Sequence, residues 1–165
     1  MLALVPMAAA PAPPSDAQLR VDSGRVVVFS LASATELCSL TRASGPRALA
    51  GGVFVQASAR SDLELRWPGK ASVRLAGPAA FALETAGRLE LERFQNAELE
   101  VRRAGLQLAL GNDIELTLAS GALQVTSLPD GGVALLHRGG QPVEIGVRAQ
   151  ASRTLHPGER LRLRR

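Results

Sequence analysis

Catalysis by this chain would depend first on its histidines and its cysteine, because these side chains supply many of the bases and nucleophiles of enzymes. The sequence contains two histidines and one cysteine, and they lie far apart. His137 follows two leucines at the end of an expected strand, His156 immediately precedes a Pro-Gly turn, and Cys38 has no neighbouring base that would activate its thiol. We therefore expect structural or surface roles for the histidines, a buried and inert thiol, and no enzymatic activity.

The acidic residues predict neither catalytic acids nor a metal site. Several glutamates alternate with leucines, so on strands they should face outward, toward arginine neighbours and water, and share no cleft; they are Glu90, Glu92, Glu98, Glu100 and Glu115. Asn112, Asp113 and Asp130 lie in turns, where such side chains usually cap the backbone rather than bind calcium. No Cys, His, Asp and Glu spacing resembles a metal site, and no glycine cluster opens a helix to hold phosphate. We expect no cofactor, no metal and no small-molecule substrate.

The elements that carry these residues are predicted to be strands. From Gln18 onward, apolar residues alternate with polar ones, and every second side chain of a strand points to the same face. The expected strands recur about every ten residues and are separated by turn-forming Gly, Pro and Asn-Asp segments, which leave no room for crossover helices. The pattern predicts one all-β domain over residues 18–165 with little helix. Its many short strands would be stacked either as a β-solenoid-like domain or as a sandwich or jelly roll.

Composition limits the classes of partner. The chain has 165 residues, a net charge of +4, one Trp, four Phe and no Tyr, so surfaces that stack on bases or sugars are not expected. The basic residues are arginines except for Lys70, and many of them alternate with acids, as over residues 88–93. Such alternation is typical of a mixed, solvated sheet face rather than of a nucleic-acid footprint. Nucleic acid is therefore not the expected partner.

Residues 1–17 form an Ala/Pro-rich leader that differs from the rest of the chain. It has the apolar run and small residues of an export signal but no basic start, as the back half of a truncated signal would. This favours a periplasmic or other extracytoplasmic location; the alternative is a floppy leader on a cytoplasmic protein. No stretch has the length of a transmembrane segment, and the longest internal apolar run, residues 26–38, is interrupted by Ser, Thr and Glu36 and predicts a strand.

The C-terminus is the one concentrated charge feature. On a strand, Arg160, Arg162 and Arg164 would share one face, followed by Arg165, while Leu161 and Leu163 would pack inward. Like charges on an edge strand prevent edge-to-edge aggregation, which is one interpretation. The other is a basic strand that binds an anionic lipid, a polysaccharide or an acidic partner.

Several segments combine glycine- and proline-containing turns with alternating strands; they are residues 45–53, 61–84, 121–125 and 155–159. They resemble the FecR-type extracytoplasmic domain family, and the best single piece of the resemblance is Gly77-Pro78-Ala79-Ala80-Phe81. Membership would imply an extracytoplasmic β-solenoid-like or sandwich domain used in cell-surface signalling or as an envelope module. The cytoplasmic anti-sigma segment and membrane span of the family's regulators are not present in this sequence. The family supplies no catalytic residues.

The sequence thus predicts a noncatalytic, FecR-like module for protein–protein contact in cell-envelope signalling or assembly. A partner strand could add to an edge of its sheets. Two alternatives belong to other classes: a ligand- or glycan-binding β module, and a small basic structural or nucleic-acid-associated subunit, whose binding would depend steeply on salt.

Overall fold

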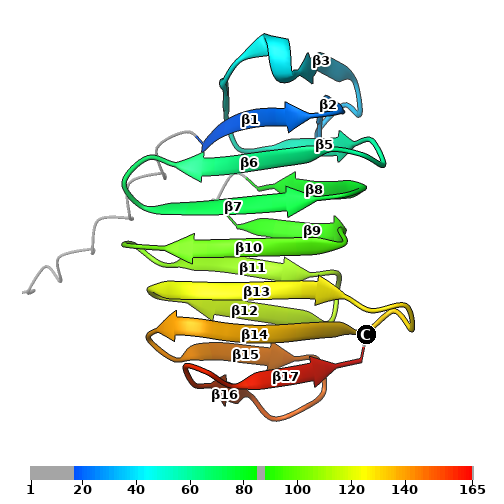
Figure 1. The fold of residues 1–165 in the computed structure, drawn as a ribbon. Coiled ribbons are helices and arrows are strands. Elements are labelled where there is room, and N and C mark those ends of the chain that lie inside the picture. The colour runs from blue at the N-terminus through cyan, green and yellow to red at the C-terminus, as the bar shows by residue number, and fades with distance from the viewer. Residues whose placement is uncertain (1–16, 85–87, 165) are drawn as a thin grey trace, which may run out of the picture.

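The fold was analysed in a computed structural model that describes residues 17–84 and 88–164. These residues form seventeen β-strands and one short 3-10 turn, Arg42–Ser44, with no α-helix among them, which confirms the all-β prediction. Two large open sheets, of eight and nine strands, lie one behind the other (Figure 1). The architecture is therefore sandwich-like. Of the leader predicted for residues 1–17, only Ala17 is described, and β1 begins there; the rest, like Arg165, lies outside the described residues.

The eight-stranded sheet has the spatial order β17 (Arg160–Leu163), β14 (Val133–Gly140), β13 (Gly121–Ser127), β10 (Asn96–Val101), β7 (Ala71–Ala76), β6 (Asp62–Trp67), β1 (Ala17–Ser23) and β4 (Arg47–Leu49). The nine-stranded sheet has the order β16 (Arg153–Leu155), β15 (Val143–Val147), β12 (Ile114–Leu118), β11 (Leu106–Leu110), β9 (Leu89–Arg93), β8 (Ala79–Leu83), β5 (Val53–Ala57), β2 (Arg25–Ser30) and β3 (Glu36–Thr41).

The chain builds both sheets together. From β6 onward it adds one or two strands to one sheet and then crosses to the other, so that the spatial order follows the sequence (Figure 1). The described pairings are antiparallel except that of β9 with β11, which are parallel because the chain passes through β10 in the other sheet between them. The first strands depart from this order, since β1 lies between β6 and β4.

One apolar core fills the space between the sheets along the whole stack. Strand β12 shows the pattern clearly: Ile114, Leu116 and Leu118 are buried, whereas Glu115 and Thr117 are exposed. Fully burying a Leu, Ile or Val side chain stabilises a fold by about 1.5–3 kcal/mol, so this alternation, repeated on most strands, supplies the main driving force for folding. The prediction of half-buried strands is confirmed.

The single strand predicted from residues 26–38 is wrong. Strands β2 and β3 form an antiparallel hairpin there, and a turn at residues 31–35 separates them. The Ser30 N–H donates to the carbonyl of Thr35 at 2.9 Å, and Ala34 takes a positive φ of 53°. The Ser and Thr residues that interrupt the apolar run therefore mark a turn, as small polar residues often do.

A pair of glycines permits close approach where β13 meets β14. Gly121, with φ of 132°, lies opposite Gly140, with φ of 104°. A Cβ atom on Gly121 would collide with the carbonyl oxygen of Gly139 and would lie 2.9 Å from the Cα atom of Gly140. Both the space and the backbone conformation therefore require glycine at position 121. Among the described residues, no helix is long and apolar enough to cross a membrane.

Candidate functional site

The C-terminal basic strand forms one edge of the eight-stranded sheet. Strand β17 pairs only with β14, and its Arg160 and Arg162 are exposed while Leu163 is buried and Leu161 packs partly against the core. Arg164 follows the strand and is exposed. The strand thus has the edge position and the two faces that its alternation predicts. Arg165 belongs to the same predicted basic strand but lies outside the described residues.

Arg162 is already engaged within the chain. Its guanidinium donates a hydrogen bond to the Asp130 carboxylate at 2.6 Å, which ties β17 to the turn between β13 and β14. The other oxygen of Asp130 accepts from the Gly132 backbone N–H at 3.1 Å, an arrangement that closes the turn. Arg160 and Arg164 have no ion pair with a described residue, so these two remain available for an external anion.

The Asp130 contacts predict a measurable titration. Hydrogen bonds from Arg162 and from the Gly132 N–H lower the pKa of Asp130 below its ordinary value of 3.8. A carboxyl with a lowered pKa stabilises the fold above its unfolded-state pKa, and this contribution disappears as the pH falls through the folded-state value. In a carbon-detected NMR titration we expect a midpoint below 3.8 in the native chain and a higher midpoint in Arg162→Gln. Equal midpoints in the two proteins would show that the ion pair does not form in solution.

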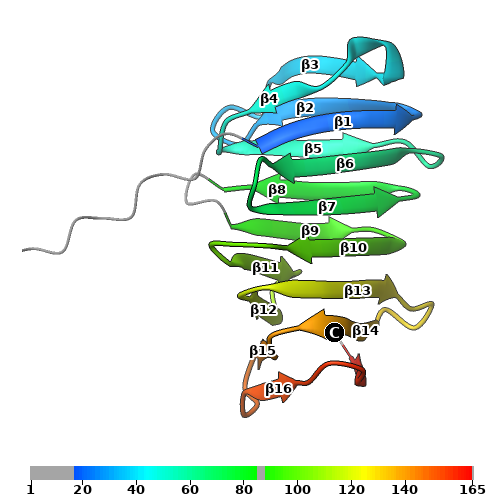
Figure 2. The ribbon, with the colours of Figure 1, turned by 60° about the vertical axis from the view of Figure 1, so that its left-hand side comes forward.

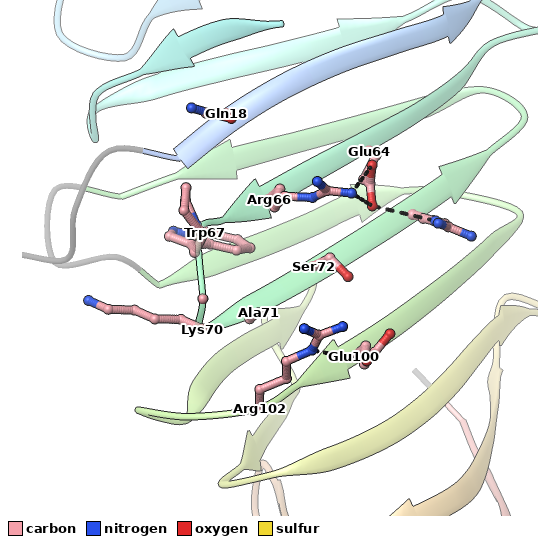
Figure 3. A pocket seen from close by; sticks show the side chains of 12 residues that line it. Gln18, Glu64, Arg66, Trp67, Lys70, Ala71, Ser72, Glu100 and Arg102 are labelled. Carbon is pink, nitrogen blue, oxygen red and sulfur yellow. Dashed lines mark hydrogen bonds and ion pairs between the residues drawn. The ribbon is translucent and has the colours of Figure 1, made fainter.

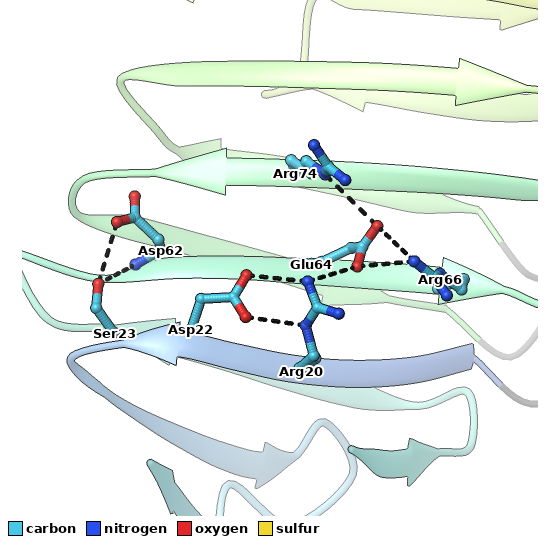
Figure 4. Close-up of polar contacts among 7 residues, drawn as sticks. All are labelled: Arg20, Asp22, Ser23, Asp62, Glu64, Arg66 and Arg74. Atoms are coloured by element: carbon cyan, nitrogen blue, oxygen red, sulfur yellow. Dashed lines mark hydrogen bonds and ion pairs between the residues drawn. The ribbon is translucent and has the colours of Figure 1, made fainter. Parts of the chain in front are cut away.

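Glu64 is the centre of a charge cluster that the sequence reasoning missed (Figure 4). Its side chain is only 3% exposed although it lies on the outer face of the eight-stranded sheet. Arg20 of β1 and Arg74 of β7 are its direct cross-strand neighbours, and Arg66 follows two residues later on β6. The carboxylate lies 3.2 Å from a guanidinium nitrogen of Arg20, 3.2 Å from one of Arg66 and 3.5 Å from one of Arg74. Glu64 is not among the glutamates named from the sequence; like them it faces outward toward arginine neighbours, but unlike them it is almost fully shielded from water.

Glu64 is shielded from water because the register of β6 with β1 and β7 places arginines beside it. Three guanidinium groups cover the Glu64 carboxylate and shield it from water. Each of the three arginines is itself partly exposed, so the buried negative charge is neutralised without burying a positive one. Arg20 also forms a pair with Asp22 at 2.9 Å, and its contacts with Asp22 and then Glu64 raise the pKa of Arg20. Only the spacing of Glu64 and Arg66 is visible in the sequence. The other neighbours depend on which strands pair, and in which register.

The two histidines lie in different surroundings. His137 is fully buried, on the same face of β14 as Val133 and Leu135, and lies within the strand rather than at its end as predicted. Neither of its ring nitrogens has a hydrogen-bond partner among the described residues. His156 is exposed in the turn before β17, where its backbone N–H donates to the Glu159 carboxylate at 2.7 Å. The structure therefore does not bring the two imidazoles together around a carboxylate.

Replacing His137 by leucine is expected to raise the free energy of unfolding. A buried polar group without a partner loses its hydration on folding, whereas leucine of similar volume does not, so we expect a gain of about 1 kcal/mol. Urea denaturation followed by circular dichroism measures this. A loss of about 1 kcal/mol or more would instead show that the imidazole forms a stabilising contact.

Strand β3 lies at the opposite end of the stack from β17 (Figure 2). Strand β3 is the last strand of the nine-stranded sheet and pairs only with β2. Leu37 on β3 and Leu31 in the preceding turn are 56% and 47% exposed, and they are the two large exposed hydrophobic residues among those described. Cys38, predicted to be buried, is partly buried and packs against the core. Exposed leucines beside an unpaired strand edge are typical of a contact surface.

Among the described residues, no group of three or more His, Cys, Asp or Glu side chains could hold a metal ion. A comparison of the chain with protein-family models, with curated proteins and with solved structures found no match. What this chain does must therefore be inferred from its own surfaces.

Proposed function

We propose that this chain is a noncatalytic, FecR-like contact module that binds a protein partner in cell-envelope signalling or assembly, and that it acts in the periplasm or another extracytoplasmic space. The single observation that carries the proposal is the free edge of β3 with its exposed Leu31 and Leu37. The partner's strand would extend the nine-stranded sheet at this edge. The FecR resemblance supports both the contact role and the location.

The edge of β3 suits strand addition for two reasons. The side of β3 that faces away from β2 pairs with no other described strand, so its outward N–H and C=O groups can form a ladder with a partner strand. Leu37 stands on this strand and Leu31 beside it, so side chains of the partner would bury apolar surface as the ladder forms. The backbone would supply affinity and the leucines specificity.

The other end of the same stack is less suited to strand addition. Strand β17 carries Arg160 and Arg162 on its exposed face, and charged side chains on an edge strand oppose pairing with another chain. The two ends therefore differ in chemistry: the β3 end exposes Leu31 and Leu37 among polar residues, whereas the β17 end exposes arginines. This difference would orient the module, with its partner at the β3 end.

The FecR resemblance also supports a finer description of the stack. The segment Gly77-Pro78 leads directly into β8, and Pro157-Gly158 leads into β17, so turns of the resembling segments lie where the chain passes from one strand to the next. Together with the regular crossing between sheets, this supports a solenoid-like stack that grows by adding equivalent strands. The apolar core would then extend from one end of the stack to the other, and the contact surfaces would lie at the two ends and on the outer faces of the sheets.

Site-specific photo-cross-linking tests the proposed contact. A photoreactive amino acid at position 37 should cross-link a discrete envelope protein from a bacterial extract, because that side chain would lie against the added strand. The matched control is position 117 on β12 of the same sheet, near the opposite edge, where Thr117 is exposed on the outer face but far from β3. Equal cross-linking from both positions, or none from position 37, would refute β3 as the contact edge.

A further inference from the structure

A hollow of about 490 Å³ lies on the outer face of the eight-stranded sheet (Figure 3). It extends over β6, β7 and the end of β10, beside the turn that joins β6 to β7. The charged side chains that line it are Glu64, Arg66, Lys70, Arg74, Glu100 and Arg102. The hollow lies apart from both β3 and the basic strand β17.

The hollow has an excess of positive charge. Four cationic side chains line it against two carboxylates, and both carboxylates are already occupied. Glu64 is shared by three guanidinium groups, and Glu100 lies 3.3 Å from a guanidinium nitrogen of Arg102. Lys70 has no ion pair with any described residue, and its side chain extends from the turn at the rim (Figure 3). Two positive charges therefore remain for a ligand.

Backbone hydrogen bonds tie the main chain of Lys70 to that of Arg102 at the rim of the hollow. The Lys70 N–H donates to the Trp67 carbonyl at 2.9 Å, which closes the turn between β6 and β7. The Lys70 carbonyl accepts hydrogen bonds from the N–H groups of Arg102 and Arg103, at 2.7 Å and 3.2 Å. The turn is thus tied to the end of β10. To bind an anion between Lys70 and Arg102, the Lys70 side chain would have to turn toward Arg102 (Figure 3), but the backbone would need little ordering, which favours affinity.

The same sheet face becomes acidic toward the other ends of these strands. A second hollow, of about 290 Å³, is lined by Asp22, Asp62 and Glu98, and Arg74 lines both hollows. A polyphosphate chain lying across this sheet face would be repelled by these carboxylates. Among the described residues that line the basic hollow, Trp67 is the one aromatic side chain, and it is buried. Nucleic acids usually need both phosphate neutralisation and aromatic stacking when they bind as single strands. A peptide with carboxylates over the basic hollow fits this charge pattern better.

We propose that the basic hollow binds an acidic segment of a protein partner, with carboxylates placed between Lys70, Arg66 and Arg102. The inference rests on the proposed contact function, for which it names the chemistry of the partner. An arginine can bind a carboxylate through two parallel hydrogen bonds, so arginines contribute directional specificity to such a site as well as positive charge. Ser72 and Gln18 add polar side chains to the lining of the hollow.

The test uses the purified chain and a fluorescent hexaglutamate peptide, followed by fluorescence anisotropy at an ionic strength of about 0.05 M, where surface charges are weakly screened. The double variant Lys70→Gln, Arg102→Gln should weaken binding at least about fivefold, because it removes the two rim cations. The control, Arg42→Gln with Arg148→Gln, removes two exposed arginines outside the hollow, so it has the same net charge as the first double variant. Its affinity should stay within about twofold of the native chain. A hexaglutamine peptide should not bind.

Two results would overturn the inference. If both double variants weaken binding equally, the peptide responds to net charge and the hollow is not a site. If tripolyphosphate or a single-stranded oligonucleotide binds more tightly than hexaglutamate and depends on the same two residues, the hollow belongs to a phosphate ligand. The outcome is separable from the β3 contact, because peptide binding by the pure chain needs no envelope partner, and cross-linking from position 37 needs no intact hollow.

Discussion

Gly121→Val is expected to lower the free energy of unfolding by more than about 3 kcal/mol, a large part of the roughly 5–15 kcal/mol that stabilises an ordinary domain. A valine side chain would collide with the carbonyl oxygen of Gly139 and the backbone of Gly140, so the β13–β14 pairing would have to separate. Position 121 also has a φ of 132°, which β-branched residues do not adopt without strain. Chemical denaturation of the purified variant, or its failure to accumulate as soluble protein, measures the effect.

Gly139 provides the matched control for this variant. It lies next to Gly140 on β14, but a Cβ atom built on it meets nothing within 4 Å. Gly139→Ala should therefore change stability by no more than about 0.5 kcal/mol. If Gly121→Val proves as stable as Gly139→Ala, the two strands do not approach each other as closely as the structure has them.

Glu64→Gln is expected to cost about 2 kcal/mol. The amide keeps the shape of the side chain but removes the charge shared by Arg20, Arg66 and Arg74, so that Arg20 keeps only Asp22 as its counter-ion and the other two lose theirs. Like charges on neighbouring strands destabilise a sheet, and a buried acceptor loses its charge-assisted hydrogen bonds. Because much of the loss is repulsion between exposed arginines, it should shrink when salt is raised to about 0.5 M.

Glu100→Gln is the control on the same sheet face. Glu100 pairs with one exposed guanidinium, that of Arg102, and is itself exposed, so its loss should cost less than about 0.5 kcal/mol. Comparison of the two variants in urea denaturation separates a buried, shared carboxylate from an ordinary surface ion pair. Equal effects would mean that Glu64 is not enclosed by its arginines.

The period-two alternation was sufficient to predict most of the strands and their inward faces, but not the hairpin of β2 and β3. The residues Ile114, Leu116 and Leu118 have the orientation that their spacing indicates, and so do Leu161 and Leu163 on the last strand. These are local properties of the pleat, so a single sequence contains them. The same local information places the arginines of β17 on one face.

Properties that depend on pairing could not be predicted. Glu64 is buried because β1 and β7 flank β6 in a register that brings Arg20 and Arg74 beside it. The basic hollow exists because the β6–β7 turn lies against the end of β10, which brings Lys70 next to Arg102. His137 alternates with core residues in the sequence, but only the length of β14 shows that the imidazole lies inside the stack.

The most direct test of the contact function is amide hydrogen exchange of the chain alone and in complex with the partner captured at position 37. A strand added to β3 would form new backbone hydrogen bonds there, so we expect slower exchange over residues 36–41 in the complex, with β17 unchanged. Unaltered exchange in β3, with protection confined to other strands, would contradict the proposal that this edge receives the partner.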